Sequence, residues 1–382
     1  MARTLRAALV ALALLGSGPL LADDEQRIFW DRSEVEDLPG GHLGLDLAYL
    51  GFLEDNEYRN AIADGTTLFG QHLRAALALR PAAFARLEAG ALLWHLFGDT
   101  ERPRLEPYLR AKLRFGGLEL IFGSLEGHLT HRLIEPLFDY ELHLTRPLET
   151  GVQLRYEHPR FFSDLWIDWV TLIRPHDPFQ EETRIGLSTI TVLLKGASGR
   201  LELPVQGTAI HLGGTIDASP LQLSTTLNGG VGLRGVLETK GFVEALRTEH
   251  HLLGYSDLSY SLERLFERGW ALYLNAAVKL RHLGWIELAY FRGDRFINPM
   301  GGALFSSVSR RVNPTLEAEP LRELLLLRLT NDLELGQGLF LSLRAEPYFD
   351  LRSLKPEFST GLYLGYRQRF PLGRVLPAPP AP

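Results

Sequence analysis

The residues most capable of chemistry gather in the stretch 127–143, which is rich in histidines and acids. Its titratable members include His128, His131, Arg132, Glu135, Asp139 and Glu141. Two histidines three residues apart, with a carboxylate nearby, are donor types that bind zinc. An isolated H-x-x-H is weak evidence for such a site, and we predict no metal here. The stretch is more apolar than an exposed loop requires. It either folds inward to narrow a channel or hold a ligand, or it packs over a rim as a cap.

Hydrolytic chemistry has no clear motif in this chain. A hydrolase needs a Ser–His pair oriented by a third group, or an acid–His pair that activates water. His143 and His158 lie near Ser163 and Asp164 in the sequence, but their spacing matches no known pattern. Neither G-x-S-x-G nor H-E-x-x-H is present, and no cysteine can act as a nucleophile. We therefore expect no enzyme and no cofactor, and nothing indicates nucleic-acid binding.

The elements that position these residues are predicted by hydrophobic alternation with a period of two. In residues 104–115, Arg104, Glu106, Tyr108, Arg110, Lys112 and Arg114 share one face, and mainly leucines share the other. Because successive side chains of a strand point to opposite faces, such a segment has one charged and one apolar wall. The same alternation recurs in 149–158, 270–281 and 338–349. Segments of this length fit tilted strands that cross a membrane.

Alternation and turn signals together divide the chain into an all-β series of strands. We predict strands at 43–53, 68–80, 83–96, 104–115, 117–126, 149–158, 161–171, 182–194, 199–211, 214–227, 229–238, 250–260, 269–281, 283–292, 322–333, 338–350 and 357–370. Short Pro/Gly turns alternate with the longer stretches 54–67, 127–148, 172–181 and 293–321. Bacterial single-chain barrels have an even strand number, so one assignment in this odd series is wrong. A missed strand at 241–248 would give eighteen, which we favour, and merging two neighbours would give sixteen.

The polar phase of the strands is rich in basic residues, although the whole chain carries a net charge of −6. We predict that the following side chains line the interior: Arg74, Arg86, Arg104, Arg110, Lys112, Arg114, Arg155, Arg344, Arg367 and Arg369. Fixed positive charge in a narrow aqueous passage raises the local concentration of anions. The alternative is that these residues pair with acids across strands and stabilise the barrel.

The two ends of the chain differ from this central pattern. Residues 1–22 combine Arg3 and Arg6 with an apolar run and a small-residue cleavage site, which is typical of a secretory signal peptide. We expect residues 23–42 to form a short periplasmic segment and 43–370 to form the barrel. The Pro-rich residues 371–382 should form a periplasmic tail, because proline is poorly suited to continuing a strand.

The last predicted strand carries a family resemblance. In Gly361–Phe370 apolar and polar residues alternate, and the segment closes with Phe370. It resembles the C-terminal assembly signal of bacterial outer-membrane proteins, although a tail follows the phenylalanine here. The whole pattern is similar to porin-like channels. This resemblance implies an antiparallel up-and-down barrel of about 16–18 strands in the outer membrane. It also implies membrane lipid and the barrel-assembly machinery as partners.

The function expected from this resemblance is a channel for small solutes, with a preference for anions. The first alternative is a surface-binding or assembly barrel with a plugged lumen, and an outer-membrane hydrolase ranks behind it. The transported solute and the oligomeric state cannot be read from one sequence.

Overall fold

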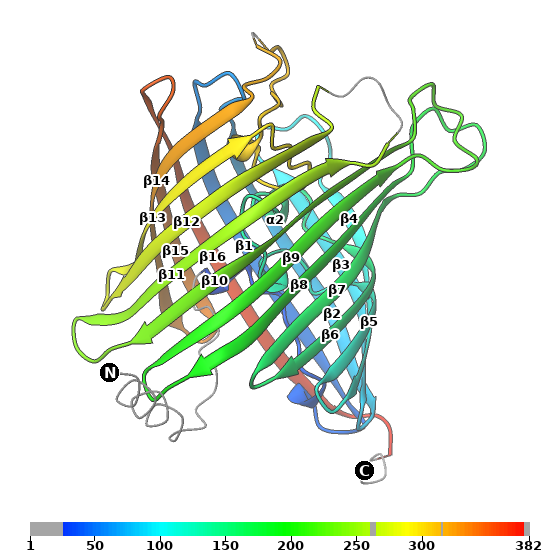
Figure 1. The fold of residues 1–382 in the computed structure, drawn as a ribbon. Helices are drawn as coiled ribbons and strands as arrows, with labels where there is room; N and C mark the ends of the chain where they lie inside the picture. The colour runs from blue at the N-terminus through cyan, green and yellow to red at the C-terminus, as the bar shows by residue number, and fades with distance from the viewer. Residues whose placement is uncertain (1–25, 260–264, 315, 378–382) are drawn as a thin grey trace.

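Sixteen antiparallel strands close into one barrel in the computed structural model, which describes residues 26–259, 265–314 and 316–377. Each strand pairs with its neighbours in sequence, and β1 pairs with β16 to close the sheet (Figure 1). The strands are β1 (His42–Glu57), β2 (Thr67–Ala82), β3 (Ala85–Leu96), β4 (Arg104–Phe115), β5 (Leu118–Ser124), β6 (Thr150–His158), β7 (Phe161–Thr171), β8 (Glu182–Lys195), β9 (Gly199–Leu212), β10 (Ser224–Glu238), β11 (Val243–Asp257), β12 (Arg268–Leu280), β13 (Gly284–Asp294), β14 (Leu321–Gly336), β15 (Leu339–Asp350) and β16 (Lys355–Arg374). The up-and-down all-β barrel predicted from the alternation is confirmed.

The helices are short and lie outside the strands. They are the 3-10 turns η1 (Arg27–Phe29), η2 (Val35–Asp37), η3 (His128–His131) and η4 (Ala303–Phe305), and one α-helical turn, α2 (Leu142–Thr145). Within the part of the chain that the structure describes, no helix is long and apolar enough to cross a membrane.

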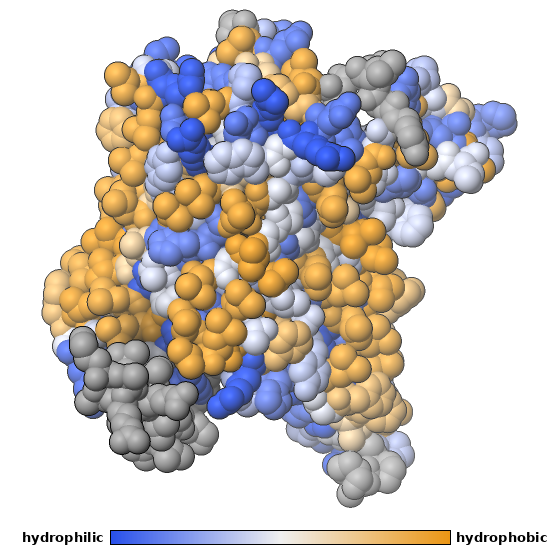
Figure 2. Space-filling view, in the orientation of Figure 1, coloured by the Kyte–Doolittle hydropathy of each residue, from blue (hydrophilic) through white to orange (hydrophobic). Residues whose placement is uncertain are grey.

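Burial alternates along the strands and identifies which side chains face the lumen and which face outward. In β4, Tyr108, Arg110 and Lys112 are buried inside the barrel, whereas Leu105 and Leu109 are 70% and 59% exposed. Hydrophobic side chains therefore cover much of the outer surface (Figure 2). Long loops join the strands at one rim and short turns at the other, and this asymmetry identifies the long-loop rim as the extracellular one.

The predicted strand count of eighteen is wrong, because two predicted strands are in fact one. Asn228-Gly229-Gly230 lies inside β10 instead of forming a turn, and its residues pair with both β9 and β11. Residues 214–223 belong to a loop. Residues 243–248 begin β11 and are not an additional strand. Glycine weakens a strand without ending it when both neighbouring strands supply hydrogen bonds.

The C-terminal boundary also differs from the prediction. β16 continues through Pro371 to Arg374, so the tail does not begin at residue 371. Pro371 faces Gly44, next to a register shift in β1, where a missing backbone donor is tolerated. The predicted signal peptide, residues 1–22, lies outside the described residues.

Three segments fill the lumen, and we call them together the plug: residues 26–41, 125–149 and 295–312. The first segment was expected in the periplasm, but its side chains bind wall residues of β2, β4, β6 and β16 from inside. The second segment folds inward, as one of the two interpretations proposed. The third contacts the second through Asn298, whose Nδ2 donates to the Pro136 carbonyl over 3.1 Å.

Candidate functional site

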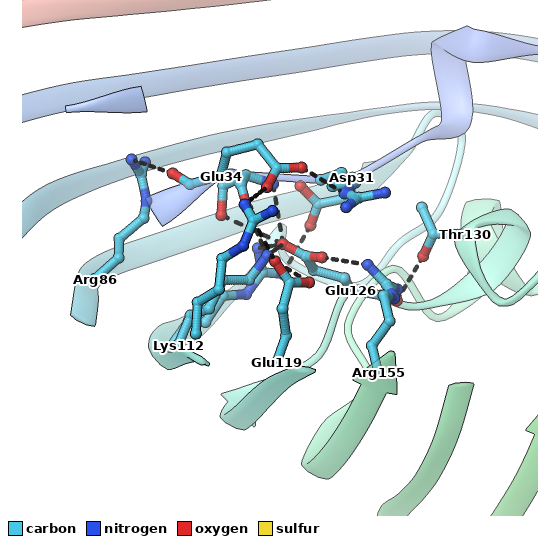
Figure 3. A network of polar contacts seen from close by, with 12 residues as sticks. Asp31, Glu34, Arg86, Lys112, Glu119, Glu126, Thr130 and Arg155 are labelled. Atoms are coloured by element: carbon cyan, nitrogen blue, oxygen red, sulfur yellow. Dashed lines mark hydrogen bonds and ion pairs between the residues drawn. The ribbon is translucent and has the colours of Figure 1, made fainter. Parts of the chain in front are cut away.

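A buried ionic network joins the plug to the wall formed by β4–β7. Its centre is Glu126, which is fully buried (Figure 3). The Glu126 carboxylate lies 2.6 Å from Lys112 Nζ and 2.6 Å from Arg155 Nη1, and 3.6 Å from Arg110 Nη1. It also accepts the backbone N–H of Ser33 over 2.9 Å. Burial opposes ionisation, but the three cations outweigh it and lower the pKa of Glu126 to about 2.

The N-terminal segment supplies acids that neutralise further wall arginines. Asp31 Oδ2 lies 2.5 Å from Arg74 Nη1 and 3.1 Å from Arg110 Nη2. Although burial favours its neutral form, these two guanidinium groups hold the pKa of Asp31 well below its usual range. Glu34 lies 2.8 Å from Arg114. The acidic side chains of this segment therefore neutralise arginines of the wall along the inside of the barrel.

Nine of the ten basic residues predicted to line the lumen contact the plug or acids of the wall. Besides those above, Arg86 binds Asp46 and Glu88, Arg369 binds Asp37 and Asp46, and Arg344 binds Glu346. Arg367 donates to the Ile28 carbonyl over 2.6 Å. Arg104 differs, because its exposed side chain pairs with Glu101 near the extracellular rim and stacks over Trp94. Most of these partners lie on the plug or on the same strand, and Arg369 with Asp46 is a pair across neighbouring strands.

His131 lies at the base of the inserted loop, between two carboxylates. Its Nε2 is 2.8 Å from Glu149 and its Nδ1 is 2.9 Å from Asp164, and the ring stacks on Trp166 at 3.5 Å. Burial alone would lower the pKa of His131, but the two carboxylates raise it to about 9. An imidazolium with both nitrogens committed cannot serve as a general base.

The predicted H-x-x-H pair does not form a metal centre. His128 contacts Glu149 at 3.3 Å and the Pro147 carbonyl at 3.2 Å. Burial lowers the pKa of His128, so it stays neutral beside the charged His131. Among the described residues, no group of three or more His, Asp or Glu side chains is arranged to hold a metal ion.

The other predicted loop residues occupy the tip of the inserted loop. Glu135 pairs with Arg328 and Arg344, and Glu141 accepts a hydrogen bond of 3.1 Å from Asn56. Asp139 Oδ1 accepts the backbone N–H of Glu141. Burial raises the pKa of all three acids, most for Glu141, which also faces other carboxylates. Arg132 pairs with Glu157 at 3.3 Å.

A luminal cavity of about 140 Å³ remains between this loop and β10–β15. Its polar lining comes from both the plug and the wall: Gln26, Arg132, Glu135, Arg234, Arg247, Glu249, Tyr273, Asn275, Glu287, Arg328 and Arg344. Five arginines and three glutamates line the cavity, so its lining keeps an excess of positive charge.

The outer wall carries a second, larger hollow of about 770 Å³ over β1, β16, β15 and β14. Its sides are leucines: Leu53, Leu283, Leu329, Leu343 and Leu362. Asp55 and Thr67 are polar residues in its lining, near the extracellular ends of β1 and β2, and Thr67 Oγ1 donates to Asp55 Oδ1 over 2.6 Å. A carboxylate can accept a proton and an apolar surface can bind hydrocarbon, and both kinds of group line this hollow.

Sequence reasoning missed this outer-wall site. Asp55 and Thr67 were assigned to the loop stretch 54–67, whereas β1 continues to Glu57 and β2 begins at Thr67. The alternation does place Asp55 on the same face as Leu53, which is a signal for an acid on the membrane-facing wall. The hollow itself depends on the register of four strands and has no local signature.

Comparisons with known proteins agree with the barrel. OprD of Pseudomonas aeruginosa superposes with a TM-score of 0.51 at 9% identity, covering 88% of this chain and 97% of that one. OmpT of Vibrio cholerae gives a TM-score of 0.48 at 10% identity, covering 85% and 99%. The likeness to OprD shows the fold alone. No curated protein matches the sequence.

The family match concerns function as well as fold. Residues 34–375 match the family described as lipid A 3'-O-deacylase-type, which is an enzyme family. The expectation that the chain is not an enzyme is therefore wrong. That expectation rested on the absence of short catalytic motifs, whereas the family match extends over the whole barrel. The chain is an outer-membrane β-barrel protein and belongs to the lipid A 3'-O-deacylase-type family.

Proposed function

We propose that the protein hydrolyses an acyl ester of lipid A, working from the membrane-facing side of its barrel. The family match over residues 34–375 is the observation that carries this proposal. The filled lumen supports it, because a lipid with several acyl chains has no open path through the plug. A membrane lipid can reach the outer wall directly.

The outer-wall hollow is the site that fits such a substrate best. Its leucines offer an acyl chain a surface equivalent to the bilayer interior, so binding there costs little desolvation. Asp55 and Thr67 lie near the extracellular rim, at the side where the ester groups of outer-leaflet lipid lie. In this proposal the Asp55 carboxylate accepts a proton from the attacking water. The water oxygen bonds to the acyl carbon, the ester C–O bond breaks, and the proton held by Asp55 passes to the leaving alkoxide. A fatty acid and an alcohol are released.

The test is a deacylation assay with purified protein and lipid A in mixed micelles, analysed by mass spectrometry. We expect loss of one acyl chain, and a fall of about 100-fold or more in rate for Asp55→Asn. Glu57→Gln changes an acid two residues further along the same face of β1 and should leave the rate unchanged. An active Asp55→Asn variant would reject this site, and an inactive wild-type protein would reject the activity.

Solute passage is the second candidate, favoured by the basic lumen and its cavity of about 140 Å³. Conduction would require the plug to move, because its three segments cross the lumen. Planar-bilayer recordings under a salt gradient test it. Steady steps with an anion-selective reversal potential would support passage and the anion preference together, and silence from a folded barrel would reject both.

A further inference from the structure

A second, smaller luminal cavity of about 50 Å³ lies where the N-terminal segment, the inserted loop and β16 meet. Two guanidinium groups, Arg74 and Arg367, line it together with Asp31 and the imidazoles of His72 and His143. Its remaining lining includes Ile28, Leu50 and Leu92. It is separate from the larger luminal cavity and from the outer-wall hollow.

The positive charge around this cavity exceeds the negative charge. Asp31 is its one acidic lining residue among those the structure describes, and Arg74 shares this carboxylate with Arg110. Arg367 donates to the Ile28 carbonyl, and no carboxylate of the described residues lies within 4.0 Å of it. Arg367 is therefore a guanidinium in the lumen with no direct ion pair, and low polarity penalises such incompletely compensated charge.

A neutral donor is also available at this place. His143 is nine-tenths buried, and its Nδ1 has no hydrogen-bond partner. His72 is engaged differently, because its Nε2 lies 3.0 Å from the Leu144 carbonyl. Burial and the neighbouring His128 and His72 hold the pKa of His143 well below its usual range, so its ring is uncharged. A neutral imidazole can present one N–H to an anion.

We propose that this cavity binds one small monovalent anion of the halide class, held chiefly by Arg367 and Arg74. The size of the cavity agrees with this class, since a single water needs about 10–15 Å³ by the same kind of measure. The anion supplies the charge that Asp31 alone does not. Because the site joins the plug to β2 and β16, the bound anion stabilises the N-terminal segment inside the barrel.

Thermal unfolding in detergent at constant ionic strength tests the proposal, with sodium chloride exchanged for sodium gluconate. We expect the Tm to be higher in chloride by about 2 °C or more, because a ligand stabilises the state that binds it. Arg367→Leu should abolish this difference. Arg369→Leu is the matched control, since Arg369 lies on the same strand face but has Asp37 and Asp46 as partners, and it should keep the difference.

Crystals of wild-type protein grown in bromide give a readout that needs no variant. An anomalous peak between Arg74 and Arg367 is expected. Absence of the peak, together with equal Tm values in both salts, would overturn the proposal. A chloride effect that survives in Arg367→Leu would also overturn it, by placing the ion elsewhere.

Discussion

The two halves of the lumen differ in how far ion pairs or apolar contacts hold the plug. Against β4–β7, the plug is held by ion pairs centred on Glu126 and His131. Against β11–β15, an apolar cluster that includes Phe291, Phe296 and Phe305 accompanies the ion pairs that Glu135 of the plug forms with the wall. Burial of apolar area is non-directional, so a well-filled cluster tolerates small shifts. Buried charges depend on their partners, and losing one partner leaves the others uncompensated. The ionic half should therefore be the more sensitive to single substitutions.

The largest expected effect follows from removing Glu126. Glu126→Ala leaves Lys112, Arg110 and Arg155 without their shared carboxylate, and we expect a loss of about 4 kcal/mol in unfolding free energy. Urea titration of protein in lipid vesicles, followed by tryptophan fluorescence, measures it. A loss below about 1 kcal/mol would mean that water enters this half and screens the charges.

A smaller loss is expected in the apolar half. Phe305 is 1% exposed and meets Phe291 edge-on at 5.0 Å. Phe305→Ala should cost about 3 kcal/mol in the same titration, through lost burial and the cavity left behind. Unlike Glu126→Ala, it should not change the salt dependence of unfolding. If Phe305→Ala proves more damaging than Glu126→Ala, the contrast between the two halves is reversed.

The pH dependence above neutrality tests the ionic half through His131. The folded pKa of His131, about 9, lies above its ordinary value of 6.5. Its stabilisation is therefore complete below pH 6.5 and is lost as the pH rises through 9. We expect the unfolding free energy to fall by about 3 kcal/mol across this window. His131→Gln should flatten this part of the profile, and an unchanged slope in the variant would assign the effect to another group.

The smallest effect belongs to the exposed pair at the rim. The side chains of Arg104 and Glu101 are 55% and 65% exposed. Arg104→Ala should change stability by about 0.5 kcal/mol or less, since water screens the pair. The unfolding free energies of Arg104→Ala and Arg110→Ala are measured under the same conditions. Arg110 is the comparison because it lies on the same strand face but inside the lumen. Equal losses for the two variants would contradict the burial argument.

Local pattern was enough to predict most of the fold. The alternation in β4 identified its lumen face, and the phase that carries Arg110 and Lys112 is buried inside the barrel. The strand prediction failed where apolar and polar side chains do not alternate. Gly229 and Gly230 interrupt the alternation of β10, so the sequence resembles a turn although the backbone continues.

The candidate sites were less predictable, because their partners come from distant parts of the chain. That Lys112 and Arg155 belong in the interior follows from strand phase, but their pairing with Glu126 requires the loop to fold inward. The acids of the N-terminal segment, such as Asp31 and Glu34, gave no local sign of entering the lumen. Asp55 and Thr67 meet only through the register between β1 and β2.

The position of the N-terminal segment has a consequence for biogenesis. Residues 26–41 precede β1 directly, and the barrel closes when β1 meets β16, the last strand of the described chain. The segment is therefore tethered to one edge of the seam before the other edge arrives. We therefore expect the wall arginines to meet their counterions while the barrel closes, with residues 26–41 already inside it. Shortening residues 26–41 should slow insertion into the membrane and lower the stability of the folded protein.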